Sequence, residues 1–304
     1  METREWALVT YTILSQMAIG SFLVLGAIHF WAQRRAGEAE ADRLSDRALL
    51  AIGPVLVLGV LASLLHLGNP MNAYRAITNF GSSWLSREIF FTMAFTGVGF
   101  VFAIMQWRKI ATPTIRMAVA AAAAIIGVAS VYSMSHIYML PNQPSWNTAA
   151  TPLSFFATTL LLGSLAIGVA LSVNYSYIKS RKEAAVDVQA NLLRESLRWI
   201  AVAAIVVLGF ELVVVSASLV NFGSGDAADS LVNIANDYNV LFILRIGLVF
   251  LGAGVFAFFL YRTASVLGQE RVLFALIYGA FALVLIAEVM GRYLFYASHI
   301  KIGF

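Results

Sequence analysis

This sequence lacks cysteine and has very few charged side chains. Its 304 residues include only four His, and Asp, Glu, Lys and Arg together make up 12%. Without cysteine there is no disulfide framework, no thiolate metal site, no cysteine-ligated iron–sulfur cluster and no haem-attachment motif. Any iron–sulfur chemistry must therefore sit on another subunit. Soluble domains carry about 25% charged residues, so the low charge excludes that class.

Apolar residues take the place of the missing charges. They make up 60% of the sequence, and the mean hydropathy is +0.82. They form runs of roughly 20–28 residues, the length that a bilayer-spanning helix requires. We expect an all-α integral membrane protein, one polytopic domain over residues 1–304, with no nucleic-acid partner. The eight transmembrane helices, which could form two four-helix bundles, are predicted near 6–31, 49–67, 86–107, 115–138, 152–178, 197–220, 238–261 and 272–296.

Basic residues alternate between the two sides of the predicted membrane. Fourteen of the 20 Lys and Arg lie in the loops after the first, third, fifth and seventh spans, and four lie on the other side. Because cytoplasmic loops are enriched in Lys and Arg, we expect both termini on the periplasmic side of a bacterial inner membrane. The first run is too long for a signal-peptide core and lacks a cleavage site, so we expect it to be retained.

Two consecutive span ends carry ionisable residues toward the same, outer side. The second span ends at His66, and the third begins beside Glu88. Ionisable residues at membrane depth are functional candidates by default. The structural alternatives are that His66 stabilises the C-terminus of its helix through the helix dipole and that Glu88 stabilises a helix N-terminus in the same way. Arg75, Arg87 and Trp84 lie nearby as candidate binding residues, although loop packing or partner docking would also explain them.

A second ionisable set lies deeper in the last three spans. It comprises Glu211, Arg245, Glu288 and Arg292. At about 1.5 Å per residue, the first three lie roughly 10–15 Å from the outer ends. An unpaired charge there is unfavourable, so we expect them to pair with one another. Two interpretations stay open, a structural ion-pair network between helices and an outward proton relay.

Four short motifs in order resemble the membrane anchor subunits of the dimethyl sulfoxide reductase family. They are QMAIG at 16–20, HLGNPMNAYRA at 66–76, LSREI at 85–89 and EVMGRYLFY at 288–296. The wider superfamily of polysulfide and nitrite reductase anchors shares the span number and orientation. One departure is Asn69 and Asn72, which stand where more variable or basic residues are expected.

The resemblance implies a subunit that oxidises menaquinol and passes electrons to an iron–sulfur subunit, which feeds a molybdopterin catalytic subunit. Quinol oxidation releases protons, and it needs bases near the ring hydroxyls. The resemblance places this site at His66 and Glu88, with Arg75, Trp84 and Arg87 around the head group. No metal site is expected in this protein. The inner halves of the spans contain no acid, so we expect proton release outward without pumping.

Other functions remain open at this stage. A proton-coupled transporter is one alternative, although such proteins usually show broken helices at midplane and internal repeats. A structural anchor without a quinol site is another. A haem held by His136 and His299 is a weaker possibility. The polar residues Tyr11 and Gln16 of the first span suit helix–helix contacts. Small residues suit close helix packing, namely Gly20, Gly26, Gly163 and Gly168.

Overall fold

The computed structural model describes residues 3–66, 78–182, 185–222, 232, 236–266 and 268–297, with the side chains of 3–5, 66, 221 and 222 outside that set. Within these residues all regular secondary structure is helical, and there is no strand. Eight helical stretches are long and apolar enough to cross a membrane, which confirms the predicted class. The helices are α1 (Thr3–Ala36), α2 (Glu38–His66), α3 (Trp84–Arg108), α4 (Pro113–His136), α5 (Ala150–Ser180), α6 (Val186–Phe222), α8 (Asn239–Val249), η3 (Phe250–Phe256), α9 (Ala257–Ala264) and α10 (Glu270–Ala297).

Two helices extend well beyond the predicted spans at the end that carries the basic loops. Helix α2 begins at Glu38 because Gly37, with φ of 89°, allows a sharp turn directly after α1. Acidic residues in its first turn suit the positive end of the helix dipole. Helix α6 likewise begins at Val186, so most of the expected loop at 179–198 is helix. The prediction that the inner halves contain no acid is therefore wrong, since Asp42 and Asp46 lie on α2 itself.

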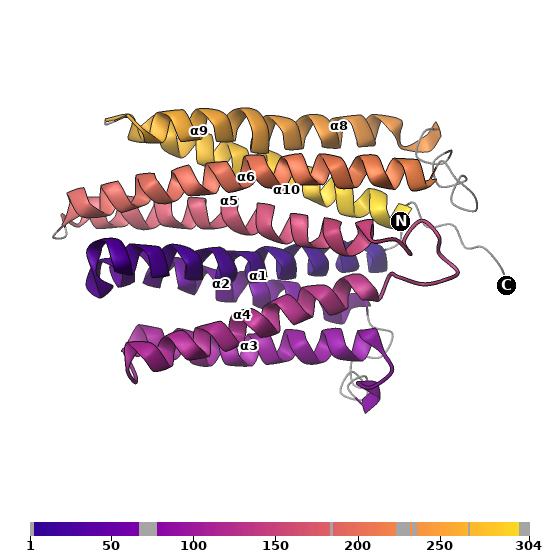
Figure 1. Ribbon diagram of the computed structural model, residues 1–304, viewed down its shortest axis with the longest axis horizontal. Coiled ribbons are helices and arrows are strands. Elements are labelled where there is room, and N and C mark those ends of the chain that lie inside the picture. The colour runs from indigo at the N-terminus through magenta and orange to yellow at the C-terminus, as the bar shows by residue number, and fades with distance from the viewer. Residues whose placement is uncertain are drawn as a thin grey trace.

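The helices form an elongated bundle with α1 and α5 at its centre (Figure 1). Helix α1 packs against α2 and α5, α3 packs against α4, and α6 packs against α5 and α9. Helices α3 and α4 lie along one edge and α8 and α9 along the other. The central contact is very close, because a Cβ atom on Gly163 would overlap the backbone of Gly20 on α1. The packing role predicted for these two glycines is confirmed.

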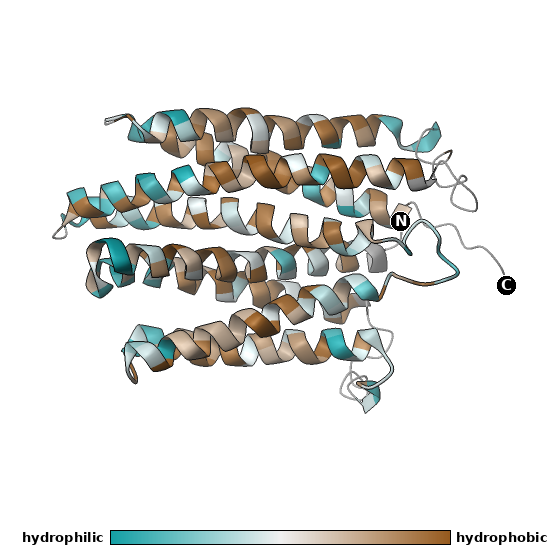
Figure 2. Cartoon of the chain, viewed as in Figure 1, coloured by the Kyte–Doolittle hydropathy of each residue, from teal (hydrophilic) through white to brown (hydrophobic). Residues whose placement is uncertain are grey.

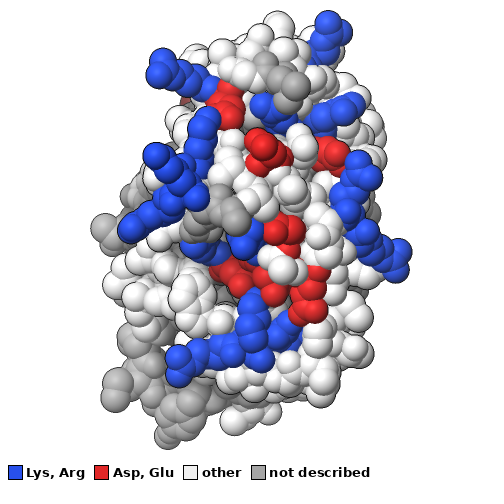
Figure 3. Space-filling model, turned by 90° about the vertical axis from the view of Figure 1, so that its left-hand side faces the viewer, with Lys and Arg blue, Asp and Glu red and all other residues white. Residues whose placement is uncertain are grey.

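The outside of the bundle is apolar along most of its length, and polar residues gather toward its ends (Figure 2). Large apolar side chains such as Leu65 and Ile125 are 76% and 71% exposed, as expected for surfaces that face lipid. At one end, Lys and Arg surround a smaller group of Asp and Glu (Figure 3). We call this end, formed by the segments 34–47, 108–116, 179–198 and 262–271, the basic end. We call the other end, where α2 ends at His66, α3 begins at Trp84 and α4 ends at His136, the opposite end.

The seventh span is interrupted by a π-helical stretch, η3, between α8 and α9. A π turn adds a residue to the helix and re-aims the side chains around it. Gly252 in this stretch faces α10, where a Cβ atom would crowd Val284 and the carbonyl of Ala280. The stretch thus lets α10 approach the seventh span closely.

Candidate functional site

Glu88 is buried in the first turns of α3 at the opposite end of the bundle. Ser83 caps this helix, since its side chain accepts a hydrogen bond from the Ser86 amide at 3.4 Å. The Glu88 side chain points inward, and the residue is only 5% exposed. Its side-chain partner is the hydroxyl of Tyr11 on α1. Among the described residues, the Tyr11 hydroxyl therefore binds a carboxyl that is shielded from bulk water.

A series of hydroxyl groups continues from Glu88 into the bundle. The Tyr11 hydroxyl oxygen lies 3.3 Å from the Thr92 hydroxyl oxygen. The Thr92 hydroxyl oxygen lies 2.8 Å from the Ser130 hydroxyl oxygen. These side chains belong to α1, α3 and α4, and Thr92 and Ser130 are buried. Sequence reasoning assigned Tyr11 only a packing role. Tyr11 stands between Thr10 and Thr12 in an otherwise apolar run, and nothing in that spacing shows that it meets Glu88 of α3.

Trp84 and Arg87 lie beside Glu88 but turn away from it. Arg87 donates to the carbonyls of Phe80 and Gly81 at 3.0 and 2.7 Å, and its guanidinium lies 4.3 Å from the Trp84 ring centroid. No ion pair between Arg87 and Glu88 occurs in the part of the protein that the structure describes. Arg87 thus fixes the segment that leads into α3.

The predicted partners of Glu88 on the preceding segment lie outside the described side chains. Helix α2 ends at His66, as predicted, but the side chain of this residue falls outside the described set. Arg75 also lies outside the described residues. The backbone therefore places the end of α2 at the same end of the molecule as the start of α3 (Figure 1). The roles of His66 and Arg75 stay predictions.

His136, at the end of α4, is held by aromatic neighbours. Its ring lies 3.9 Å from that of Tyr132 and 4.7 Å from that of Trp84, measured between centroids. Its Nδ1 also lies 2.8 Å from the Tyr132 carbonyl. His299, the other candidate haem ligand, falls outside the described residues. Within the described residues, no group of three or more His, Asp or Glu side chains could hold a metal ion.

The deeper ionisable residues come together across the helices that follow α5. Arg245 on α8 forms an ion pair with the buried Glu211 on α6, and the Arg245 side chain itself is 13% exposed. Glu288 on α10 accepts a hydrogen bond from Thr158 of α5 at 2.6 Å. Glu211 and Glu288 lie close enough to interact electrostatically. The expected pairing is thus found for Glu211 with Arg245, whereas Glu288 binds a hydroxyl, and the function of the cluster stays open.

Arg292 connects this cluster to α1. It shares the buried face of α10 with Glu288, yet it donates to the amide oxygen of Gln16 on α1 at 2.8 Å. The Gln16 amide nitrogen in turn donates to the carbonyl of Phe155 at 3.1 Å. The Arg292 guanidinium also lies 3.7 Å from the Phe155 ring centroid, a cation–π contact. Gln16 thus fixes a buried cation between α1, α5 and α10.

Aromatic side chains close the opposite end above Arg292. Tyr138 and Tyr296 share a hydrogen bond at 2.8 Å, and Trp146 stacks on Phe295 with ring centroids 5.1 Å apart. The Trp146 indole donates to the Phe295 carbonyl at 2.9 Å. Burial raises the pKa of the Tyr138 hydroxyl well above its usual value. This cluster of rings packs the 137–149 segment onto the end of α10.

Comparison with known proteins identifies the family. The family model "DMSO reductase anchor subunit (DmsC)" matches residues 1–298. The protein is 29% identical over 300 residues to an anaerobic dimethyl sulfoxide reductase chain of Escherichia coli, in a match that covers 98% of this protein and 96% of that relative. It is 28% identical over 306 residues to the identically named reductase chain of Haemophilus influenzae, with the same coverage.

A solved structure shares the fold. The bd oxidase from Geobacillus thermodenitrificans superposes with a TM-score of 0.67 at 12% identity, in a match that covers 97% of this protein and 85% of that structure. The match of the family model over almost the entire sequence confirms the resemblance of the four motifs. The chain belongs to the family of DMSO reductase anchor subunits.

Proposed function

We propose that this protein is the membrane anchor and quinol-oxidising subunit of a respiratory molybdoenzyme complex of the dimethyl sulfoxide reductase type. The observation that carries the proposal is the buried carboxyl of Glu88, held by Tyr11 near the start of α3, at the same end of the molecule as the end of α2. Menaquinol is the proposed electron donor. A carboxyl in such a site can take a proton from a quinol hydroxyl as the ring gives up its electrons.

Each residue of the proposed site has a distinct role. His66 and Glu88 are the two bases that face the two hydroxyls of the quinol ring. Arg75, Trp84 and Arg87 form the entrance around the head group, where Arg87 and Trp84 already pack on each other. Tyr11 orients the Glu88 carboxyl through its hydroxyl. The hydrogen-bonded hydroxyls of Thr92 and Ser130 hold Tyr11 in turn.

The proposed orientation follows from the charge distribution. The basic end carries most of the Lys and Arg, so it belongs in the cytoplasm of a bacterial cell, and both termini lie on the periplasmic side of the inner membrane. The helices then fall into two four-helix bundles, one of α1 to α4 and one of α5 to α10. Protons from the quinol leave on the periplasmic side, because Glu88 lies at that end.

The partners are an iron–sulfur electron-transfer subunit and, through it, a molybdopterin catalytic subunit. The relatives from Escherichia coli and Haemophilus influenzae are named as chains of anaerobic dimethyl sulfoxide reductase, which agrees with a multi-subunit assembly. This protein has no cysteine and supplies no cluster of its own. We place the docking surface on the loop that bears Arg75 and Arg87. Crosslinks from the partner to the basic end would contradict that placement.

The Glu211, Arg245, Glu288 and Arg292 network is proposed to be structural rather than a proton relay. Its members bind side chains of α1, α5, α6 and α8 in contacts that fix helix positions. Both other functions considered are less well supported. A transporter would need a path between the two ends. A structural anchor without a quinol site would leave the buried Glu88 carboxyl without a purpose.

The test is quinol-dependent electron transfer in membranes that hold the whole complex. Wild type is compared with His66→Ala and Glu88→Gln, using a menaquinol analogue as donor and, separately, an artificial donor that reduces the partner subunit directly. We expect both variants to assemble and to retain activity with the artificial donor but to lose quinol oxidation. Full quinol oxidation in both variants would show that the quinol site lies elsewhere.

A further inference from the structure

A cavity lies at the basic end, far from Glu88 along the same helices. It has a volume of about 400 Å³ and lies among α1, α2, α3 and α4. Ligand sites for small molecules span about 300–1,000 Å³, so the cavity can hold an aromatic head group. One wall is polar, and the other is apolar and includes aromatic rings such as Phe22 and Phe102.

His29 presents a hydrogen-bond acceptor to this cavity. Ser45 has one hydroxyl proton, which it donates to the Ala41 carbonyl at 2.8 Å. With that proton on Ala41, Nδ1–H is the donor in the 2.8 Å contact between His29 Nδ1 and the Ser45 hydroxyl. In the neutral imidazole, Nε2 is then an acceptor, and it lies 3.9 Å from the nearest Asp42 oxygen, beyond hydrogen-bond distance. A ligand hydroxyl can donate to it.

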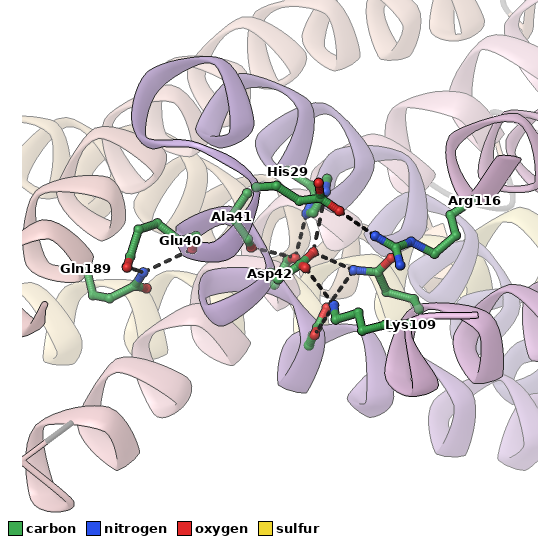
Figure 4. Close-up of polar contacts among 11 residues, drawn as sticks. His29, Glu40, Ala41, Asp42, Lys109, Arg116 and Gln189 are labelled. Carbon is green, nitrogen blue, oxygen red and sulfur yellow. Dashed lines mark hydrogen bonds and ion pairs between the residues drawn. The ribbon is translucent and has the colours of Figure 1, made fainter. Parts of the chain in front are cut away.

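Arg116 presents donors to the same cavity. Its side chain is 8% exposed, and one terminal nitrogen binds Glu38 at 2.5 Å. A guanidinium has five N–H donors, so this ion pair leaves others for a ligand oxygen. His29 and Arg116 belong to α1 and α4, and both line the cavity (Figure 4). A ring with two oxygen substituents meets an acceptor on one helix and donors on another.

The charges around the cavity favour a neutral head group over a phosphate. Asp42 and Asp46 are each bound by Lys109 at 2.7 Å and by the Gln106 amide at 2.6 and 2.9 Å (Figure 4). With Arg116 paired to Glu38, the cluster has three carboxylates against two cations. This cluster therefore has no excess of positive charge with which to bind a phosphate.

The apolar wall opens toward the surface that faces lipid. Gly26 of α1 and Ala121 of α4 line the cavity and are exposed at the protein surface. A Cβ atom on Gly26 would meet nothing within 4 Å, so the packing role predicted for this glycine is wrong. The missing side chain keeps open a gap through which an apolar tail can extend into the bilayer.

We propose that this cavity is a second binding site, at the basic end, for the head group of a quinone with an isoprenoid tail. The class of ligand rests on the proposed function, whereas the site shares no residue with the Glu88 site. His29 accepts from a ring hydroxyl of the reduced form, and Arg116 donates to a ring oxygen. The Phe22 and Phe102 rings contact the faces and edges of the head group.

The test is photocrosslinking of the whole complex in lipid discs with an azido-naphthoquinone that carries a short isoprenoid tail. Adducts are mapped by mass spectrometry of peptides. Gly26→Leu and Ala121→Leu fill the cavity from two helices, so misfolding of one variant does not decide the result. Gly209→Leu is the matched control, because Gly209 is also an exposed helical glycine in open space and does not line the cavity.

We expect adducts in segments 22–33 and 113–124 of wild type and of Gly209→Leu. In both filled variants these adducts should fall about tenfold or more, which corresponds to a loss of about 1.4 kcal/mol in binding. Adducts near Glu88 should stay unchanged, so a failure of the Glu88 site is read separately. The proposal is overturned if wild type gives no adducts in these segments, if both filled variants keep them, or if a phospholipid alone occupies the cavity.

Discussion

The two ends of the bundle use ionisable residues in different ways. At the basic end, Asp42 and Asp46 each bind both Lys109 and Gln106, in contacts that pin helix ends near water. At the opposite end, Glu88 is buried and has the Tyr11 hydroxyl as a side-chain partner, with no Lys or Arg paired to it among the described residues. Carboxylates that are bound by cations serve structure. A buried carboxyl with no cation beside it can accept a proton.

The largest expected difference is in the rate of quinol oxidation when a carboxylate is replaced by the matching amide at each of the two ends. Glu88→Gln should lower quinol oxidation by about 10²–10⁴-fold, because it removes a general base. Asp42→Asn should leave the rate near that of wild type, because Asp46 still binds Lys109. The measurement is initial rates of quinol oxidation by the assembled complex. Equal losses in both variants would contradict the distinction between the ends.

Removing a buried partner should destabilise the fold. Arg245→Met leaves Glu211 as an unpaired charge and should cost about 3–5 kcal/mol of unfolding free energy. The double variant Glu211→Leu with Arg245→Met should recover most of this loss. Denaturation in mixed micelles measures both. A stable double variant that no longer oxidises quinol would show that the pair belongs to the proton route.

Packing at the central contact should have an intermediate effect. Gly163→Ala introduces a Cβ atom into the Gly20 backbone, which should destabilise the protein by about 1–3 kcal/mol. Gly209→Ala, in open space on α6, is the matched control and should change stability little. Thermal unfolding of the purified protein in detergent distinguishes the two. Equal stability of both variants would mean that α1 and α5 are farther apart than described.

The smallest effect is expected at the surface of the basic end. Lys109→Met removes an ammonium group that is 40% exposed and should cost about 0.2–1 kcal/mol. The loss should shrink as salt concentration rises, because salt screens exposed pairs. Unfolding at low and high salt measures it. A large, salt-independent loss would indicate that this end is drier than its exposure suggests.

The span number and the residues at span ends could be read from the sequence, since hydropathy and helix length dictate both. The pairing of Glu211 with Arg245 followed from their equal depth. The extension of α2 to Glu38 could not be predicted, because the acidic residues there resemble those of a loop. In the structure, Gly37 turns the backbone so that α2 runs along α1. Residue spacing also could not show that Gly26 faces a cavity while Gly163 faces a backbone.

The partners of each site residue were harder to predict for a physical reason. Neighbouring ionisable residues on one helix suggest mutual pairing, yet Arg292 binds Gln16 of α1 and Glu288 binds Thr158 of α5. Arg87 binds backbone carbonyls of the segment before α3. These choices depend on how helices distant in sequence pack together. Local spacing carries no information about that packing.

The decisive measurement is the side on which quinol protons appear. The whole complex is placed in liposomes of known orientation. The complex oxidises the quinol and passes the electrons to ferricyanide, which accepts them without taking up protons. A pH-sensitive dye reports each side separately. We predict proton release on the side of the opposite end, where Glu88 lies, and loss of this signal in Glu88→Gln. Proton release on the side of the basic end would contradict a quinol site at Glu88.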